Sequence, residues 1–359
     1  MTLLVFFLHH VLKIISRFKF STPNKKGVYS PLIVNISSGI GDALMAEPLI
    51  RTLRAAWPEV VIDVIAGAST SLLFEKHPDV RCVYVLKPQW LDWLRLARRL
   101  CIKKYCLYVG TIPSNTLSQL LLPWLAGIPF CIKHKTPHTG SRDFDFLFQR
   151  LEPIPDGRHR LECNLDLLKH IGINAVNIKP EIIIASETDK KVNNLLQKKE
   201  FDKKKLTVGF HPGCNPQAAF KRWAPENYAK LIRYLQEQWH AQIILVGGKD
   251  EEEDVEKIES LLTRKPFNFV GKADLHETAA LIKHCRFFVS NDSGIMHLAT
   301  AVDVPVFAIF GPKDERHIGP YGVKHTVMRN GKEVNNVSVE QVVDTLLQSN
   351  YGLKGMSPL

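Results

Sequence analysis

Short apolar runs alternate with amphipathic stretches along most of this 359-residue chain. An apolar run of about four to eight residues is typical of a buried strand, and apolar residues spaced three and four apart are typical of a helix. This pattern predicts strands over 32–36, 60–65, 105–109, 181–184, 207–210, 242–246, 268–270, 287–289 and 306–310. It predicts helices over 43–56, 90–100, 117–125, 161–171, 225–239, 250–262, 276–283 and 338–347. The alternation indicates an α/β protein with parallel sheets.

The alternating pattern falls into two halves, as expected for two domains in a chain of this length. We expect the first domain over residues 28–188 and the second over residues 189–335, followed by a helix and tail over 336–359. Residues 133–160 are polar, aromatic and interrupted by prolines, which predicts a binding loop rather than core.

Residues 1–27 form a separate segment, with a helical pattern and then a polar linker. Lys13 and Arg17 fall opposite an apolar face made by Leu4, Phe7, Leu8, Val11, Ile14, Ile15 and Phe18. The apolar run is too short to span a bilayer, and it lacks the charge placement and cleavage site of a signal peptide. Two interpretations remain: a basic amphipathic helix that lies on an anionic membrane surface, and an ordinary helix packed on its own domain.

Charge and cysteine content narrow the kinds of partner. Lys and Arg number 47 against 36 Asp and Glu, which gives a net charge of +11 and a pI near 9.2. Such a balance favours nucleic acid, phosphorylated ligands or an acidic membrane face. The chain has no zinc-finger, RNP or Arg-rich sequence, so we expect no nucleic-acid partner. The seven cysteines have no Cys-x-x-Cys spacing, which predicts reduced thiols of a cytosolic protein, without metal or disulfides.

Residues 287–312 carry the pattern most informative about function, a strand, a helix and a second strand. The helix is expected to begin at Asp292-Ser293-Gly294, at the carboxyl end of the first strand, where open α/β folds bind their ligands. Backbone N–H groups at Ser293 and Gly294, with the helix dipole, suit an anion such as pyrophosphate. The alternative is that Asp292 and Ser293 only cap the helix.

A second candidate lies between the first strand and the first helix, at Gly39-Ile40-Gly41-Asp42. Glycines there allow a ligand to approach the backbone closely, although the third glycine of a dinucleotide fingerprint is missing. Asp42 at the mouth of a helix is a candidate general base. The alternative is a first-turn carboxylate that only favours the helix dipole.

Two further strand ends carry candidate ligand groups. His211-Pro212-Gly213 ends one strand, and Lys221-Arg222 follows shortly before a helix. Lys as a point charge and Arg as a fork suit a phosphate beside a glycine turn. The alternative is a solvated Lys-Arg pair on the surface.

Gly247-Gly248 ends the next strand and precedes three consecutive glutamates, beginning at Glu251. A carboxylate there can accept the two hydroxyls of a ribose, as in Rossmann proteins. Alternatively, these glutamates only favour the start of a helix.

Together these motifs resemble glycosyltransferase family 9, the ADP-heptose:lipopolysaccharide heptosyltransferases. The matching motifs follow the family order from Leu32 to about Leu347, and the N-terminal helix lies outside them. They are Gly39-Ile40-Gly41-Asp42 with Pro48, His211-Pro212-Gly213, Lys221-Arg222-Trp223, Gly247-Gly248 with the following Glu, Asp292-Ser293-Gly294 with His297-Leu298-Ala299, Phe310-Gly311-Pro312 and Gly319-Pro320. The stretch 106–110 departs from the family, which usually has an acidic strand end there.

The resemblance implies a GT-B-like α/β fold, with two Rossmann-like domains that face each other across a cleft. It implies an inverting, metal-independent transfer without a cofactor, from ADP-heptose to a sugar hydroxyl of the lipopolysaccharide inner core. The implied partners are the nucleotide sugar, a lipid-linked core oligosaccharide and an anionic membrane surface. The implied location is cytoplasmic, peripheral at the inner face of the inner membrane.

The resemblance also implies roles for individual residues. Asp42 is the implied catalytic base. The donor diphosphate is assigned to Lys221, Asp292, Ser293, Gly294 and His297, the donor nucleoside to Gly247, Gly248 and Glu251, and the cleft backbone to Gly39, Gly41, His211 and Gly213. Two alternatives remain: a related enzyme that transfers another sugar, or hydrolyses or epimerises it, and a non-catalytic nucleotide- or lipid-binding protein, against which Asp42 and Lys221 argue.

Overall fold

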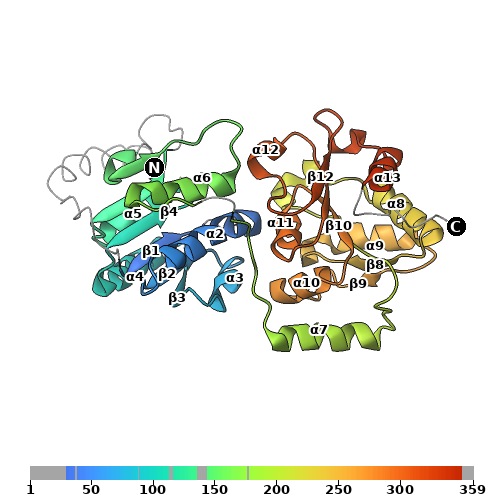
Figure 1. The fold of residues 1–359 in the computed structure, drawn as a ribbon, viewed down its shortest axis with the longest axis horizontal. Coiled ribbons are helices and arrows are strands. Elements are labelled where there is room, and N and C mark those ends of the chain that lie inside the picture. Colours follow the sequence, from blue (N-terminus) through green and yellow to red (C-terminus); the bar gives the residue numbers. More distant parts are fainter. Residues whose placement is uncertain are drawn as a thin grey trace. The chain divides into compact units, whose positions relative to one another are not determined.

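The computed structural model describes residues 30–36, 39–87, 89–112, 116–135, 144–175 and 178–349, so the helix predicted within residues 1–27 lies outside the described part. The chain divides into two compact units, residues 1–178 and 179–359 (Figure 1). The boundary expected from the sequence follows residue 188. The segment after residue 178 is tied to the second unit, because Lys179 pairs with Asp303 and the Ile182 N–H donates to the Ala301 carbonyl.

Six parallel strands form the sheet of the first unit, in the order β3-β2-β1-β4-β5-β6 (Figure 1). These strands are β1 (Leu32–Asn35), β2 (Ile62–Ala66), β3 (Cys82–Val85), β4 (Leu107–Gly110), β5 (Phe130–His134) and β6 (Arg150–Glu152). The helices are α2 (Ile40–Ala56), α3 (Ser71–Glu75), α4 (Trp90–Lys103), α5 (Leu117–Leu125) and α6 (Arg160–Asp166), with 3-10 turns η2 (Asp145–Leu147) and η3 (Leu167–Ile171). Helix α2 packs against α6, and α4 packs against α5.

The second unit repeats this plan with the order β12-β11-β10-β7-β8-β9, again with every pairing parallel. Its strands are β7 (Thr207–His211), β8 (Gln242–Leu245), β9 (Phe267–Asn268), β10 (Phe287–Asn291), β11 (Val306–Ile309) and β12 (His325–Met328). Its helices are α7 (Ser186–Lys198), α8 (Pro225–Gln238), α9 (Glu252–Ser260), α10 (Leu275–Ile282), α11 (Gly294–Ala301), α12 (Glu315–Ile318) and α13 (Val339–Gln348). The 3-10 turns are η4 (Pro216–Lys221), η5 (Lys249–Glu251) and η6 (Val334–Asn336).

The two sheets therefore share one topology. Counted from the first strand of each unit, both orders read 3-2-1-4-5-6, the order of a Rossmann fold. The order reverses between β1 and β4 in the first unit and between β7 and β10 in the second. Ligands of such sheets bind beyond the carboxyl ends of the strands at this switch point. We therefore expect ligand-binding residues at these two switch points.

Each unit has its own hydrophobic core. In the first, Leu96 and Leu100 of α4 and Leu121 of α5 pack with Ile33 and Tyr108 of the sheet. In the second, α8 and α13 pack on strands that are apolar and fully buried. Buried apolar runs of this kind are the pattern that parallel strands show in sequence, which is why most of the strands were predictable.

Some predicted elements differ from the structure. The strand predicted over 181–184 is wrong, because this segment belongs to neither sheet. The loop predicted over 133–160 is wrong at the end of β5 and at β6, which lie within this range, and its role in binding stays a prediction. Strand β5 was not predicted. Its last two residues, Lys133 and His134, are polar but buried, and the Lys133 ammonium lies 2.5 Å from the Asp145 carboxylate, which compensates its charge.

Helix boundaries also differ from the prediction. Helix α2 begins at Ile40 rather than at residue 43, which places Gly41 and Asp42 in its first turn. The helix predicted over 161–171 is α-helical only to Asp166 and continues as the 3-10 turn η3. Among the described residues, no helix combines the length and the apolar character needed to cross a bilayer.

Candidate functional site

The two switch points hold most of the residues that the sequence marked. In the first unit, Asp42 follows β1. In the second unit, His211 ends β7, Gly247 follows β8, and Ser293 follows β10. Because β10, β7 and β8 are neighbours in the sheet, the motifs from 211, 247 and 293 come together at one edge.

Asp42 is held in the first turn of α2 by an ion pair. Its Oδ1 atom accepts a hydrogen bond from Nη1 of Arg160 at 2.9 Å, and both side chains are half-buried. The α2 N-cap residue, Gly39, has no side chain to cap the helix, so the carboxylate is the negative group nearest the positive end of the dipole. A guanidinium and a helix N-terminus both favour the ionised form of a carboxyl group.

Arg160 was not found from the sequence, where it reads as one more basic residue. It is the first residue of α6 and is brought to Asp42 by the packing of α6 on α2. The buried Asn164 side chain fixes that packing: its amide donates to the Met45 carbonyl at 3.2 Å and accepts from the Ile112 N–H at 3.1 Å. Only the fold brings the residues at 42 and 160 together.

Lys221 and Asp292 form an ion pair in the second unit. The Lys221 Nζ lies 2.6 Å from Oδ2 of Asp292, and little of either side chain is exposed. Lys221 is placed by the buried Trp223, whose N–H donates to the Asn291 side chain and whose indole donates to the Val337 carbonyl. The cation therefore stands beside the start of α11, with a carboxylate as its present counter-ion.

Arg222, the neighbouring cation, faces a different set of groups. Its Nη1 donates to Asp254 at 2.7 Å, and its Nη2 donates to the Cys214 carbonyl at 3.1 Å. These contacts join the 211–214 turn to α9. Burial raises the pKa of the Cys214 thiol, although Arg222 and Lys221 act against this shift. Arg222 thus stabilises the turn, and Lys221 is left as the cation next to α11.

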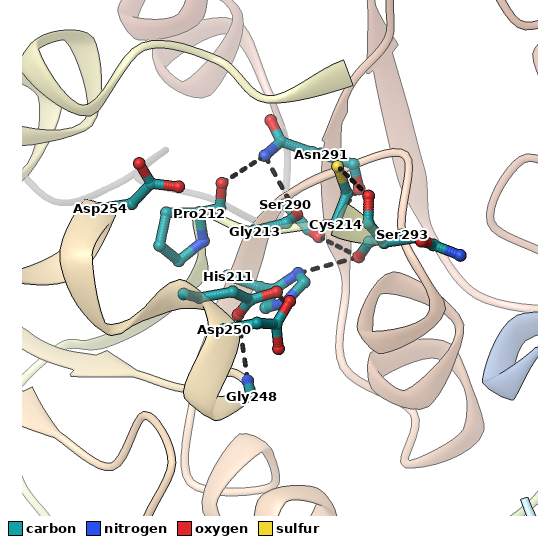
Figure 2. Close-up of polar contacts among 12 residues, drawn as sticks. His211, Pro212, Gly213, Cys214, Gly248, Asp250, Asp254, Ser290, Asn291 and Ser293 are labelled. Carbon is teal, nitrogen blue, oxygen red and sulfur yellow. Dashed lines mark hydrogen bonds and ion pairs between the residues drawn. The ribbon is translucent and has the colours of Figure 1, made fainter. Parts of the chain in front are cut away.

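His211 is the centre of a buried network that links the three strand ends (Figure 2). Its Nδ1 atom lies 2.9 Å from the Ser293 hydroxyl, and its Nε2 atom lies 3.0 Å from Oε1 of Glu251. A proton on Nε2 donates to the carboxylate and leaves Nδ1 to accept from the hydroxyl, so one neutral tautomer satisfies both contacts. The second Glu251 oxygen accepts from the Gly248 N–H at 3.1 Å. The sequence predicts that Glu251 is a ribose ligand. In the structure its side chain is buried, and each of its oxygens has a hydrogen-bond partner.

Two glycines are required by the position of Glu251. A Cβ atom on Gly213 would lie 1.8 Å from Oε1 of Glu251, and one on Gly247 would lie 1.9 Å from its Oε2. The carboxylate cannot move away without losing its contacts with the His211 ring and the Gly248 N–H. The close approach of backbone and carboxylate therefore explains why both turns carry glycine.

Asn291, the last residue of β10, is a further organising residue that the sequence did not single out. Its buried amide donates to the Pro212 and Gly213 carbonyls, at 2.6 and 3.2 Å (Figure 2). Its side-chain oxygen accepts from the Trp223 N–H and, at 2.9 Å, from the Tyr228 hydroxyl. The sequence does not predict these hydrogen bonds, because an asparagine before Asp292 is equally typical of a turn.

Ser293 caps α11, as predicted in the interpretation in which Asp292 and Ser293 cap the helix. Its hydroxyl accepts from the Met296 N–H at 3.3 Å, and the helix begins at Gly294. Asp292 contributes its side chain to Lys221 instead of to the cap. His297 is buried one turn further along α11. The first N–H groups of a helix have no acceptor within it, so the start of α11 beside Lys221 is suited to an anion.

The sequence profile of glycosyltransferase family 9 (heptosyltransferase) matches residues 93–345, well over half of the chain. The chain belongs to glycosyltransferase family 9. The predicted family and enzyme class are thereby confirmed: the protein is a glycosyltransferase. The matched range includes His211, Lys221 and Ser293, whereas Asp42 lies before it.

Relatives and solved structures agree with this family assignment. Lipopolysaccharide heptosyltransferase 2 of Escherichia coli is 28% identical over 311 residues, which cover 81% of this chain and 86% of the relative. A glycosyltransferase family 9 structure from Veillonella parvula superposes with a TM-score of 0.78 at 20% identity, covering 89% of this chain and 97% of its own. The E. coli ADP-heptose lipopolysaccharide heptosyltransferase II gives a TM-score of 0.75 at 23% identity, covering 88% and 97%. The predicted GT-B-like fold, with two Rossmann-like domains, is confirmed.

The candidate groups of this family 9 member are cations, carboxylates, hydroxyls and backbone N–H groups. In the described part of the chain, no group of three or more His, Cys, Asp or Glu side chains is arranged to hold a metal ion. All seven cysteines are free thiols, and four of them are buried. The first unit offers the Asp42 carboxylate with Arg160 as its partner, and the second offers Lys221 beside the start of α11.

Proposed function

We propose that this protein transfers a heptose from ADP-heptose to a sugar hydroxyl of the lipopolysaccharide inner core, with inversion at the anomeric carbon and without a metal ion. The observation that carries the proposal is the cation Lys221 beside the start of α11, at the switch point of the second unit. The relatives that suggest this donor and acceptor are the E. coli heptosyltransferases.

The donor diphosphate is assigned to Lys221 and to the first N–H groups of α11, at Ser293 and Gly294. In the free protein, the Asp292 carboxylate is the partner of Lys221. A diphosphate carries more charge than a carboxylate, so it competes for the ammonium when the donor binds. His297, buried in the next turn, completes the proposed anion site.

The nucleoside is assigned to the backbone of Gly247 and Gly248, which follows β8. Glu251 supports this turn, because its carboxylate accepts from the Gly248 N–H. Each carboxylate oxygen of Glu251 already has one partner, the His211 ring or the Gly248 N–H, and the side chain is buried. We therefore propose that Glu251 acts mainly by holding the two glycine turns in place.

The chemical step is assigned to Asp42. Its carboxylate takes the proton of the acceptor hydroxyl while that oxygen forms a bond to the anomeric carbon of the heptose. The bond between this carbon and the β-phosphate oxygen breaks, and its electron pair leaves with ADP. Attack opposite the leaving group inverts the anomeric configuration. Arg160 holds this carboxylate in place through the hydrogen bond from its Nη1 atom.

Charge that grows on the departing diphosphate is neutralised by fixed positive groups. Lys221 and the N-terminal N–H groups of α11 supply them, in a site where little of Lys221 or Asp292 is exposed. Such preorganised groups stabilise a leaving oxyanion in the way a divalent cation does in other enzymes. This supports the proposal of a transfer without a metal ion or another cofactor.

The acceptor is proposed to be carried on lipid at the cytoplasmic face of the inner membrane. The net charge of +11 favours association with an anionic leaflet. The basic amphipathic helix expected within residues 1–27 remains a prediction, since it lies outside the described residues.

A donor panel tests this function. The purified protein is incubated with inner-core acceptor that lacks heptose, and with ADP-heptose, ADP-glucose or UDP-N-acetylglucosamine in turn. We expect release of ADP and a gain of one heptose mass, only when ADP-heptose and acceptor are both present. Release of ADP without acceptor would indicate a hydrolase, an altered sugar without acceptor an epimerase, and binding without turnover a non-catalytic protein.

A further inference from the structure

The outer face of α4 carries large apolar side chains in water. Trp90, Leu91, Leu94 and Ile102 are 64%, 47%, 47% and 70% exposed. These side chains do not pack the helix against its unit, because the residues of α4 that do so, Leu96, Ala97 and Leu100, are buried on the opposite side. A surface helix normally turns polar residues to solvent, so this second apolar face is in excess of what folding requires.

The same face is strongly basic. Arg95, Arg98 and Arg99 lie between the apolar side chains along α4, and Lys103 and Lys104 follow at its end; all five are exposed. Asp92 is the only acidic residue of the helix, and it pairs with Arg95 at 2.9 Å. Within the described structure, Arg98 and Arg99 form no ion pair.

Apolar anchors interspersed with unpaired cations match the chemistry of one kind of partner. A protein partner with an apolar groove does not need the arginines, and a nucleic acid does not need the exposed Trp, Leu and Ile side chains. An anionic phospholipid surface satisfies both, because the apolar groups enter the acyl boundary while Arg and Lys reach the phosphates. Trp at an interface of this kind is favoured by its amphipathic ring.

We propose that the outer face of α4, defined by Trp90, Leu91, Leu94, Arg98, Arg99 and Ile102, docks on an anionic phospholipid bilayer. Helix α4 follows β3, so it starts at the carboxyl edge of the sheet, the edge at which Asp42 lies. Docking at α4 brings this edge towards a bilayer-borne acceptor; this clause alone rests on the proposed function. The surface is distinct from the segment 1–27.

Vesicle binding of the full chain tests the surface without nucleotide sugar or acceptor. Phosphatidylglycerol–phosphatidylcholine vesicles are compared with pure phosphatidylcholine vesicles by co-sedimentation, at low and high salt. Three variants are used: Arg98→Glu/Arg99→Glu, Trp90→Ser/Leu94→Ser, and Lys190→Glu/Lys198→Glu. The last is the matched control, because it reverses two exposed cations on α7, which has no large exposed apolar side chain.

We expect the intact chain to prefer the anionic vesicles. Reversal of Arg98 and Arg99 should lower the partition coefficient ~tenfold or more, since each cation near an anionic surface adds to the binding. The Trp90/Leu94 variant should lose the binding that remains at high salt. The α7 control should bind nearly as the intact chain does. Brominated lipid should quench less fluorescence in Trp90→Phe than in the intact chain.

Several outcomes would overturn the proposal. Equal vesicle binding by the α4 variants and the intact chain would place membrane contact elsewhere, for example in residues 1–27. Loss of binding in the α7 control as large as in the arginine variant would show that only net charge matters. A self-associated intact chain that becomes monomeric in the α4 variants would assign the face to a second copy. Transfer to a delipidated acceptor should persist in the α4 variants; if no protein shows transfer, the proposed function fails independently of the vesicle result.

Discussion

Lys221 is the residue to which we assign the donor diphosphate. In the free protein it is held by Asp292 at 2.6 Å, and Trp223 fixes the chain on its other side. The ammonium is thus positioned before a diphosphate arrives, which reduces the entropy that ordering a long side chain costs on binding.

Lys221→Ala is therefore expected to weaken ADP binding as well as turnover. A hydrogen bond to a charged group is typically worth ~1.5–3 kcal/mol, which is roughly tenfold to a hundredfold in the dissociation constant. Calorimetry with ADP measures it. Lys257→Ala is the control, because it removes an exposed lysine that pairs with Glu226 in the same unit. Unchanged ADP affinity in Lys221→Ala would remove this lysine from the donor site.

His134, at the end of β5, makes the first unit sensitive to acid. Burial lowers the pKa of His134 from 6.5 to about 4. The unfolded chain therefore takes up this proton near pH 6.5, and the folded chain does not until about pH 4. Stability is present above pH 6.5 and falls as the pH drops towards 4, by ~3 kcal/mol in total.

His134→Leu should flatten this dependence. We expect the fall in Tm between pH 7 and pH 5 to be smaller in the variant than in the intact chain, whatever its Tm at pH 7. Thermal unfolding followed by circular dichroism at the two pH values measures the difference. An identical fall in both proteins would show that His134 does not control the acid response.

At the scale of elements, the proposed donor site depends on how β7, β8 and β10 end. Glu251 fills the space beside Gly213 and Gly247 and bonds to the His211 ring. The Asn291 amide then ties the 212–213 turn to the end of β10. Buried hydrogen bonds thereby connect the three loops that follow these strands.

A double-mutant cycle tests this packing. Gly213→Ala should lower the free energy of unfolding by ~1–3 kcal/mol, because its Cβ overlaps the Glu251 carboxylate. In a Glu251→Ala background the same substitution should cost much less, since the overlapping group is gone. Chemical denaturation of the four proteins gives the coupling energy. Additive effects would mean that the Glu251 side chain does not set the requirement for glycine.

The elements also show what a sequence can reveal. Apolar runs such as 207–210 and 306–310 predicted buried parallel strands, and the motif at 292–294 predicted a helix start that the structure has at Gly294. Strand β5 was not predicted, and its last two residues are polar; the buried charge of Lys133 is compensated by Asp145, a contact that no local pattern encodes. The strand predicted over 181–184 failed because an apolar run does not ensure a neighbour in a sheet.

The same limit applies to the candidate site. Asp42, Lys221 and Ser293 were found because each belongs to a motif at a strand end. Arg160 and Asn291 were missed, because their roles depend on partners that are distant in sequence, namely Asp42 and the 212–213 turn. Glu251 was noticed from its place after two glycines, but its burial beneath them depends on the His211 ring, which only the folded unit supplies.

At the scale of the whole molecule, we assign different roles to the two units. In the function that we propose, the second unit binds the donor through Lys221 and α11, and the first unit supplies the base, Asp42. Each unit has its own core and its own switch point. A defect in the base should therefore leave donor affinity intact, which separates chemistry from binding in one experiment.

The most direct test compares Asp42→Asn with Asp79→Asn. Asp79 is a matched control: it pairs with Arg54 in the same unit, and its side chain is 20% exposed, as is that of Asp42. With ADP-heptose and heptose-free inner core at saturation, kcat of Asp42→Asn should fall ~10²–10⁴-fold, the usual contribution of a general base. ADP affinity should stay unchanged, and Asp79→Asn should keep full activity. Near-normal kcat in Asp42→Asn, or an equal loss in Asp79→Asn, would contradict the account.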